Sequence, residues 1–182
     1  IWGGHAGGRT ETLREAVVAG IAETGEVIEL RQRPALEAGI DDLLWCEALL
    51  IATPEHFGYM SGAVKDFFDR TFYPAEGRTE ALPYAVIISA GNDGAGTVAS
   101  IERIATGYRW KRVAPPLVVV GAPTDATLTR VRELGATIAA GLSRPSRLIR
   151  SAIAAPAEWP TASTGRTCNS ASSAASACAM PG

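Results

Sequence analysis

The sequence predicts an α/β protein with a doubly wound, three-layer sandwich, in which a parallel sheet of strand order 2-1-3-4-5 lies between two layers of helices. Three observations predict this fold. Short apolar segments alternate with helical segments along residues 1–142. These apolar segments are β-branched and lack polar positions, as expected for strands that are covered on both faces. Glycine-rich loops follow the strands, at the points where crossover connections would begin.

The first half of the chain predicts three strands and two helices. Only Ile1 and Trp2 precede the first glycine loop, so the first strand is predicted to be truncated. Residues 10–24 place Leu13 and Val17 on one stripe and stop before Gly25, which indicates a helix with a glycine after its end. The other elements expected here are a short strand at 27–30, a weak helix at 35–47 and a strand at 48–52.

The second half of the chain continues the alternation. A last helix is expected to begin at a cap formed by Thr124 or Asp125 and to reach about Gly141. The elements before it are a helix at 61–72, a strand at 84–89, a helix at 95–106 and a strand at 117–120. Together with the first half they predict one domain over residues 1–142.

Residues 143–182 have a different composition. Ser, Ala and Thr dominate them, and neither helical nor alternating periodicity is visible. Such a segment buries too little apolar surface to offset its ordering entropy, so a low-complexity, disordered or processed tail is expected. Its cysteines, Cys168 and Cys178, are then interpreted as exposed thiols rather than metal ligands.

Composition limits the possible functions. The chain has 182 residues, 47% of them hydrophobic and 20% charged, with a net charge of −2. This near-balanced charge argues against nucleic-acid binding, and no apolar run is long enough for a membrane span. Three cysteines without a CxxC pair indicate neither a disulfide framework nor a zinc site. No secretory signal is visible, so we expect a cytoplasmic protein without a bound metal.

Three loops are predicted to meet at one edge of the sheet. They comprise residues 3–10 (GGHAGGRT), the segment from residue 53, and residues 89–96 (SAGNDGAG). They follow the first, third and fourth strands, whose carboxyl ends are neighbours in the predicted order. The segment from 53 to 70, TPEHFGYMSGAVKDFFDR, carries aromatic, glycine and histidine residues ahead of a helix. A nucleotide-like ligand with a flat ring is the expected occupant.

The first loop resembles a phosphate cradle. Its glycines let the backbone fold closely around an anion, the following helix offers free N–H groups, and Arg9 and Thr10 add polar side chains. The alternative is a flexible strand-to-helix turn without a ligand. A Walker loop is excluded, because Gly8 is followed by Arg9 instead of lysine.

A Rossmann-type glycine pattern occurs later, in GAGTVA, as Gly94, Gly96 and Ala99. The acidic residue that should end the next strand is missing, since the chain there has Pro116, Leu117 and Val118. This pattern is therefore interpreted as the flank of the third loop.

The string P-E-x-F-G-x-M-S-G-x-x-K-x-F-x-D-R, from Pro54 to Arg70, resembles the signature of the flavodoxin-like FMN-dependent NAD(P)H oxidoreductases. Its later part is similar to the NAD(P)H:quinone oxidoreductase branch that includes the tryptophan-repressor-binding-protein type, and Thr53-Pro54-Glu55 is similar to the NADPH-dependent FMN reductase branch. The resemblance covers residues 1 to about 141. It implies that the FMN phosphate lies against His5, Gly7, Gly8, Arg9 and Thr10, and the ring against Thr53, Pro54, Glu55, His56, Phe57, Gly58, Tyr59, Met60, Ser89, Ala90, Gly91, Asn92 and Gly94.

The resemblance also implies an activity. NAD(P)H would reduce bound FMN, which would pass electrons to a quinone, a flavin or a similar small acceptor, in a homodimer or homotetramer. No catalytic side chain is required, and His56 is only a secondary candidate for a proton donor, because a loop histidine is more often solvated. The family pattern S-x-T-G-N-T is here H-A-G-G-R-T. Arg9, with protonated His5, is expected to replace the missing hydroxyl donors.

Three alternatives stay open. A flavodoxin-type electron carrier shares the fold and FMN, but usually has a strongly acidic docking surface. A response-regulator receiver shares the doubly wound sheet, but needs a phosphorylatable aspartate where this chain has Thr53 and Pro54. The altered first strand and first loop could also leave a fold without cofactor.

Other prominent residues have structural interpretations. Phe67 and Phe68 are expected in the core or a subunit contact, and Lys65 and Asp66 on a solvated helix face. Cys46 is expected to be a buried small hydrophobe. The basic and aromatic run at residues 108–112 is interpreted as a helix end with nearby cations.

Overall fold

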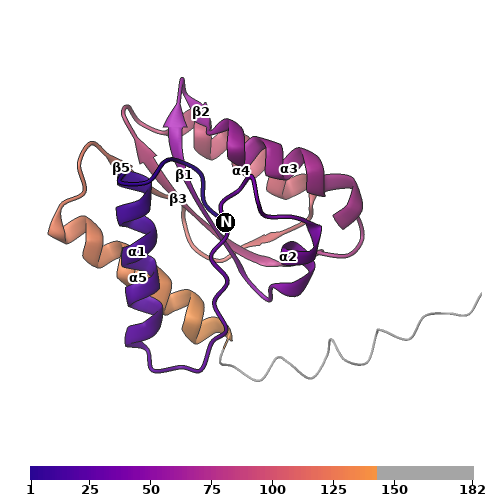
Figure 1. Ribbon diagram of the computed structural model, residues 1–182, viewed down its shortest axis with the longest axis horizontal. Helices are drawn as coiled ribbons and strands as arrows, with labels where there is room; N and C mark the ends of the chain where they lie inside the picture. The colour runs from indigo at the N-terminus through magenta and orange to yellow at the C-terminus, as the bar shows by residue number, and fades with distance from the viewer. Residues whose placement is uncertain (143–182) are drawn as a thin grey trace, which may run out of the picture. The chain divides into compact units, whose positions relative to one another are not determined.

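A mostly parallel sheet, covered by helices on both faces, forms the core of the computed structural model, which describes residues 1–142 (Figure 1). The expected tail at 143–182 lies outside the described residues. In chain order the elements are α1 (Arg9–Glu23), α2 (Ile40–Trp45), β1 (Leu49–His56), β2 (Tyr59–Met60), α3 (Gly62–Ala75), β3 (Pro83–Ala90), α4 (Ala95–Gly107), β4 (Lys111–Arg112), β5 (Leu117–Val120) and α5 (Asp125–Leu142).

The sheet has the predicted order in a reduced form. β3 is central, and it pairs in parallel with β1 on one side and with β4 and β5 on the other. β4 and β5 pair with the same edge of β3. The segment between them contains two consecutive prolines, which have no N–H to donate to a sheet hydrogen bond and so interrupt the pairing. On the far side of β1, Trp2 forms isolated parallel bridges with Ala52 and with Pro34. Trp2 is thus the one residue of the predicted first strand that pairs in the described sheet.

The prediction of a strand at residues 27–30 is wrong. These residues form no strand, and Val27 is fully exposed. The physical reason is that Trp2, the residue expected to pair with this strand, bridges to Pro34 instead. Trp2 O accepts a hydrogen bond from Ala35 N (2.8 Å), and Trp2 N donates one to Arg33 O (3.0 Å). The segment that pairs with Trp2 therefore lies several residues later than predicted.

The helix predicted at 35–47 is shorter than expected. α2 begins after Gly39, whose N–H donates to the Asp42 carboxylate (3.2 Å), and the chain before it turns at Pro34. Cys46, which ends α2, is half-buried rather than buried, and its Sγ donates to Leu43 O (3.3 Å). The other predicted helices and the later strands are confirmed to within a few residues.

Two cores lie on opposite faces of the sheet. Tyr84, Val86 and Ile88 of β3 pack toward α3 and α4, whereas Ala85 and Ile87 pack toward α1 and α5. Figure 1 shows the same division, with the α1 and α5 pair on one side and α3 and α4 on the other. This alternation confirms the three-layer sandwich, since successive residues of β3 are buried against helices on opposite faces of the sheet.

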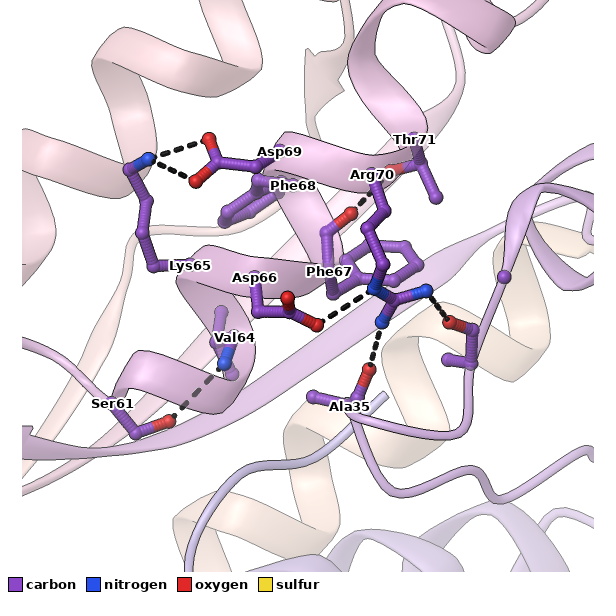
Figure 2. A network of polar contacts seen from close by, with 12 residues as sticks. Ala35, Ser61, Val64, Lys65, Asp66, Phe67, Phe68, Asp69, Arg70 and Thr71 are labelled. Atoms are coloured by element: carbon purple, nitrogen blue, oxygen red, sulfur yellow. Dashed lines mark hydrogen bonds and ion pairs between the residues drawn. The ribbon is translucent and has the colours of Figure 1, made fainter.

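Helix α3 separates its core face from its charged face as predicted. Phe67 and Phe68 are buried, and the charged residues form exposed i,i+4 ion pairs, Lys65 with Asp69 and Asp66 with Arg70 (Figure 2). The hydrogen bond to Asp69 raises the pKa of Lys65. Arg70 also donates to the carbonyl oxygens of Ala35 (2.9 Å) and Ala38 (2.8 Å), which ties α3 to the turn before α2.

The aromatic run after α4 belongs to the core. Tyr108 and Trp110 are buried and their rings stack, while Arg109 between them is exposed and pairs with Glu80. Burial raises the pKa of Tyr108 to about 12, and its hydroxyl donates to Phe68 O (2.9 Å). Among residues 1–142, no helix combines the length and apolar character needed to cross a bilayer.

Candidate functional site

The three predicted loops meet at one rim of the sheet. β1 and β3 end side by side, with Pro54 opposite Ser89 in the parallel register. Two hydrogen bonds join the loops directly. Arg9 Nη1 of the first loop donates to Ala90 O at the end of β3 (3.4 Å), and Asn92 N of the third loop donates to Glu55 Oε2 of the second (3.1 Å). The expected convergence of the loops is confirmed.

The first loop has the geometry of an anion cradle. Gly4 (φ +112°) and Gly7 (φ +72°) lie in the left-handed region that glycine adopts without strain. Gly8 N–H closes a turn onto His5 O (3.2 Å), and Gly8 then caps α1 without any side-chain hydrogen bond. The N–H groups of Arg9 and Thr10 at the start of α1 have no partner among the described residues, whereas that of Glu11 donates to Gly8 O (3.0 Å). A Cβ at Gly7 would meet nothing within 4 Å, so the loop is open on the Cβ side of this residue.

A carboxylate already binds to this loop. Gly7 N–H donates to Glu11 Oε2 (2.6 Å), and Glu11 Oε1 accepts from Arg14 Nη2 (3.2 Å). The Gly7 N–H thus binds an anionic oxygen. The role of Glu11 was not predicted from sequence. Part of the signal was present, because Glu11 lies three residues after Gly8, the spacing of a capping box. That motif predicts a hydrogen bond to Gly8 N–H, whereas the carboxylate accepts from Gly7 N–H.

The second loop begins later than predicted. β1 does not end at Ala52 but extends to His56 and turns back into β2, with Glu55 opposite Met60. Phe57 (φ 54°) and Gly58 (φ 74°) form the two-residue turn, and positive φ at both central positions is typical of a tight hairpin. The antiparallel partner β2 explains the longer strand, because it provides hydrogen bonds beyond the parallel sheet.

Residues of this hairpin divide between the surface and the interior. Phe57 is fully exposed, and His56 and Tyr59 are exposed beside it, so these side chains are free to contact a ligand. Met60 is 2% exposed and packs in the core on the α3 and α4 face, and Thr53 is completely buried. A contact of Met60 or Thr53 with a flat ring would need their backbone atoms rather than their side chains.

Buried hydroxyls fix the end of β1 to α3. Ser61 N donates to Thr53 Oγ1 (3.1 Å), and the two hydroxyl oxygens are 3.3 Å apart. Ser61 Oγ also caps α3 by accepting from Val64 N (3.4 Å). A Cβ at Gly3 would lie 2.2 Å from Ser61 Oγ, so the first loop packs directly on this hydroxyl pair. Sequence analysis missed Gly3 and Ser61 as elements that position the rim.

Thr53→Val is expected to lower the free energy of unfolding by about 2 kcal/mol, because the isosteric valine leaves the buried Ser61 N–H without an acceptor. Thr97→Val is the matched control. Thr97 is equally buried, but its Oγ1 has no hydrogen-bond partner among the described residues, so losing it should be neutral or stabilising. Urea unfolding of both variants measures the difference. Equal destabilisation at the two positions would contradict a structural role for the Thr53 hydroxyl.

The third loop leads from β3 into α4. Gly91 and Asn92 are exposed at the rim, and Gly94 (φ +68°) caps α4 in a conformation that favours glycine. Asp93 Oδ1 accepts from Ala95 N (2.9 Å). A Cβ at Gly96 would lie 2.1 Å from Gly58 O of the hairpin. The glycines of GAGTVA therefore allow close packing within the rim, which agrees with their interpretation as a flank of the third loop.

Comparisons with solved structures define the class of protein. The chain has the fold of flavodoxin-like α/β proteins. An archaeal flavodoxin superposes with a TM-score of 0.68 at 20% identity, covering 79% of this chain and 96% of that one. A WrbA-like flavodoxin from Agrobacterium tumefaciens gives a TM-score of 0.61 at 16% identity, covering 77% of this chain and 92% of that one. At these identities the likeness concerns the fold alone.

Sequence comparison gives the family. The sequence profile of the NADPH-dependent FMN reductase family matches residues 6–125, and the chain belongs to this family. A flavodoxin from Aquifex aeolicus (strain VF5) is 29% identical over 99 residues, which make up 54% of this chain and 53% of that protein. The chain thus spans about half the length of this curated relative.

Proposed function

We propose that this protein is an FMN-dependent oxidoreductase that passes electrons from NAD(P)H to a quinone, a flavin or a similar small acceptor. One observation carries the proposal: in a chain of the FMN reductase family, the three loops are joined at one rim by the Arg9–Ala90 and Asn92–Glu55 hydrogen bonds. This arrangement provides donors for a phosphate and an exposed aromatic hairpin within one site.

Two groups of residues would hold the cofactor. The phosphate would lie against Gly7 and Gly8 of the first loop, with Gly7 N–H and the side chains of His5, Arg9 and Thr10 as donors. The ring would lie between the hairpin, with its exposed Phe57 and Tyr59, and the loop of Gly91 and Asn92. Bound FMN supplies hydride acceptance and electron release. The chain itself orients the ring, shields one side from water and leaves another side open to the co-substrate.

An absorption titration and a turnover assay test this function. FMN added to the purified protein should produce a bound flavin spectrum, and NAD(P)H should then be consumed continuously in the presence of a quinone. A preparation that never takes up FMN would overturn the proposal. Binding of FMN without NAD(P)H consumption would instead favour a flavodoxin-type electron carrier, the second candidate, which the similarity to the Aquifex aeolicus flavodoxin supports. Against the carrier stands the near-balanced net charge of −2.

The assembly and the location belong to the same proposal. We expect a homodimer or homotetramer in the cytoplasm, with small molecules and no nucleic acid as partners. The fully exposed Phe57 ring at the hairpin tip supports an assembly in which a neighbouring copy covers the rim. Light scattering coupled to size exclusion, with and without FMN, measures the oligomeric state.

Arg9→Ala is expected to weaken FMN binding about tenfold, because one charge-assisted hydrogen bond to the phosphate is lost. Riboflavin, which lacks the phosphate, should bind to the variant almost as it binds to the wild type. Arg130→Ala is the control. Arg130 is an exposed arginine on α5, so its substitution removes the same positive charge at a different place. Fluorescence titration measures all the affinities. An Arg9→Ala variant with no greater loss of FMN affinity than Arg130→Ala would refute the phosphate role of Arg9.

A further inference from the structure

Glu11 occupies a donor that the proposed phosphate site needs. Its Oε2 accepts the Gly7 N–H at 2.6 Å, and Gly7 stands in the middle of the glycine loop, where an added Cβ would meet nothing within 4 Å. A phosphate bound to this loop would present its own oxygens to the same N–H. The Glu11 carboxylate and a phosphate cannot both bind here, because only one N–H group is offered by Gly7 and the two negative charges repel each other.

Arg14 holds Glu11 and also offers it a second position. Arg14 Nη2 donates to Glu11 Oε1 (3.2 Å), and its Nη1 donates to Gln32 Oε1 (2.5 Å). The guanidinium carbon lies 5.0 Å from the centre of the Trp2 ring, which fixes its place. Arg14 Nε is buried and has no hydrogen-bond partner among residues 1–142. A carboxylate that leaves Gly7 can therefore pair with both Nη2 and Nε of Arg14 in the bidentate geometry that arginine favours.

We propose that Glu11 is a specificity-determining residue of the flavin site, whose carboxylate competes with the FMN phosphate for Gly7 N–H and moves onto Arg14 Nε when the phosphate binds. This inference rests on the proposed function. The competition lowers the affinity for the phosphorylated flavin and leaves the affinity for riboflavin unchanged. The protein therefore discriminates less between FMN and riboflavin than its glycine loop alone would allow.

Paired titrations of FMN and riboflavin test this role. Glu11→Gln keeps the shape of the side chain but removes the negative charge, and it should tighten FMN binding about tenfold, the effect of removing one competing charge-assisted hydrogen bond. Riboflavin affinity should stay within about twofold, so the ratio of the two affinities rises about tenfold. In the absence of flavin, inorganic phosphate should raise the unfolding temperature more for Glu11→Gln than for the wild type.

Glu15→Gln is the matched control. Glu15 Oε1 lies 3.7 Å from the same Arg14 Nη2, so this variant removes an equal charge from the same helix without touching Gly7. It should leave the ratio of FMN to riboflavin affinities unchanged. An equal gain in FMN affinity in the Glu11→Gln and Glu15→Gln variants would show that the effect comes from net charge, and it would overturn the inference.

Other outcomes separate this inference from the proposed function. A wild type that binds FMN together with a Glu11→Gln variant of equal or weaker FMN affinity would overturn the role of Glu11 alone. If neither protein binds FMN, and inorganic phosphate shifts the unfolding temperature of neither, both the inference and the proposed function fail. If only the variant binds FMN, the competition by Glu11 is confirmed, and the proposed function fails for the wild-type protein.

Discussion

Gly20→Ala is expected to lower the free energy of unfolding by about 3 kcal/mol, because α1 and α5 cross in direct backbone contact at this residue. A Cβ at Gly20 would lie 2.1 Å from Arg132 O, and a Cβ at Gly135 would lie 2.4 Å from Val17 O. Each helix thus presents a glycine to the backbone of the other. Neither backbone can move aside without displacing the apolar residues that both helices pack against the sheet.

Gly141→Ala separates this crossing effect from the general effect of alanine in a helix. Gly141 also lies in α5, but a Cβ there would meet nothing within 4 Å. Alanine should be neutral there or stabilise the protein by up to about 1 kcal/mol, as helix propensity predicts. Urea unfolding followed by circular dichroism gives both values. A Gly20→Ala variant as stable as Gly141→Ala would show that the helices separate at little cost.

Combining Gly20→Ala with Gly135→Ala tests whether the two glycines act at one crossing. Once the first alanine has forced the helices apart, the second has more room. The double variant should therefore lose less stability than the sum of the single losses. Additive losses would indicate that the helices yield independently at the two positions.

The sequence predicts the elements that carry strong local signals. β3 is recognisable from its continuous apolar run, and α5 from Thr124, whose Oγ1 accepts from Thr127 N (3.3 Å). The segment expected to form a strand at 27–30 is also mostly apolar, but Trp2, its expected neighbour, pairs with Pro34 instead. Whether a strand forms depends on its partner, and a single segment carries no information about that. The contacts of Gly20 and Gly135 are hidden for the same reason, since a helix glycine shows its purpose only against the opposing helix.

The candidate site was predictable in its location but not in its side-chain directions. Parallel strands end at the same edge, so the order of strands and loops along the chain was enough to bring Arg9 to Ala90 and Glu55 to Asn92. The hairpin turn at Phe57 and Gly58 fixes which side chains face outward. Without that register, Met60 is indistinguishable from the exposed Tyr59 beside it.

Gly96→Ala is expected to weaken FMN binding more than tenfold and to lower the free energy of unfolding by about 2 kcal/mol, since the added methyl group has no room. Its Cβ would lie 2.1 Å from Gly58 O at the tip of the hairpin. The two-residue strand β2 holds this tip with few hydrogen bonds, so the hairpin is the part that should move. That movement would separate the second and third loops and lengthen the 3.1 Å contact of Asn92 N with Glu55.

Gly62→Ala provides the control, because Gly62 begins α3 directly after the same loop and a Cβ there would meet nothing within 4 Å. Its FMN affinity and stability should match those of the wild type. Titrating each variant with FMN and with riboflavin adds a further distinction. Gly96 lies on the side of the rim proposed for the ring, so Gly96→Ala should weaken the binding of both flavins by similar factors, whereas Arg9→Ala should weaken only the binding of FMN. If Gly96→Ala binds both flavins normally while losing stability, the spacing of the second and third loops does not determine flavin binding, and the ring must lie elsewhere on the rim.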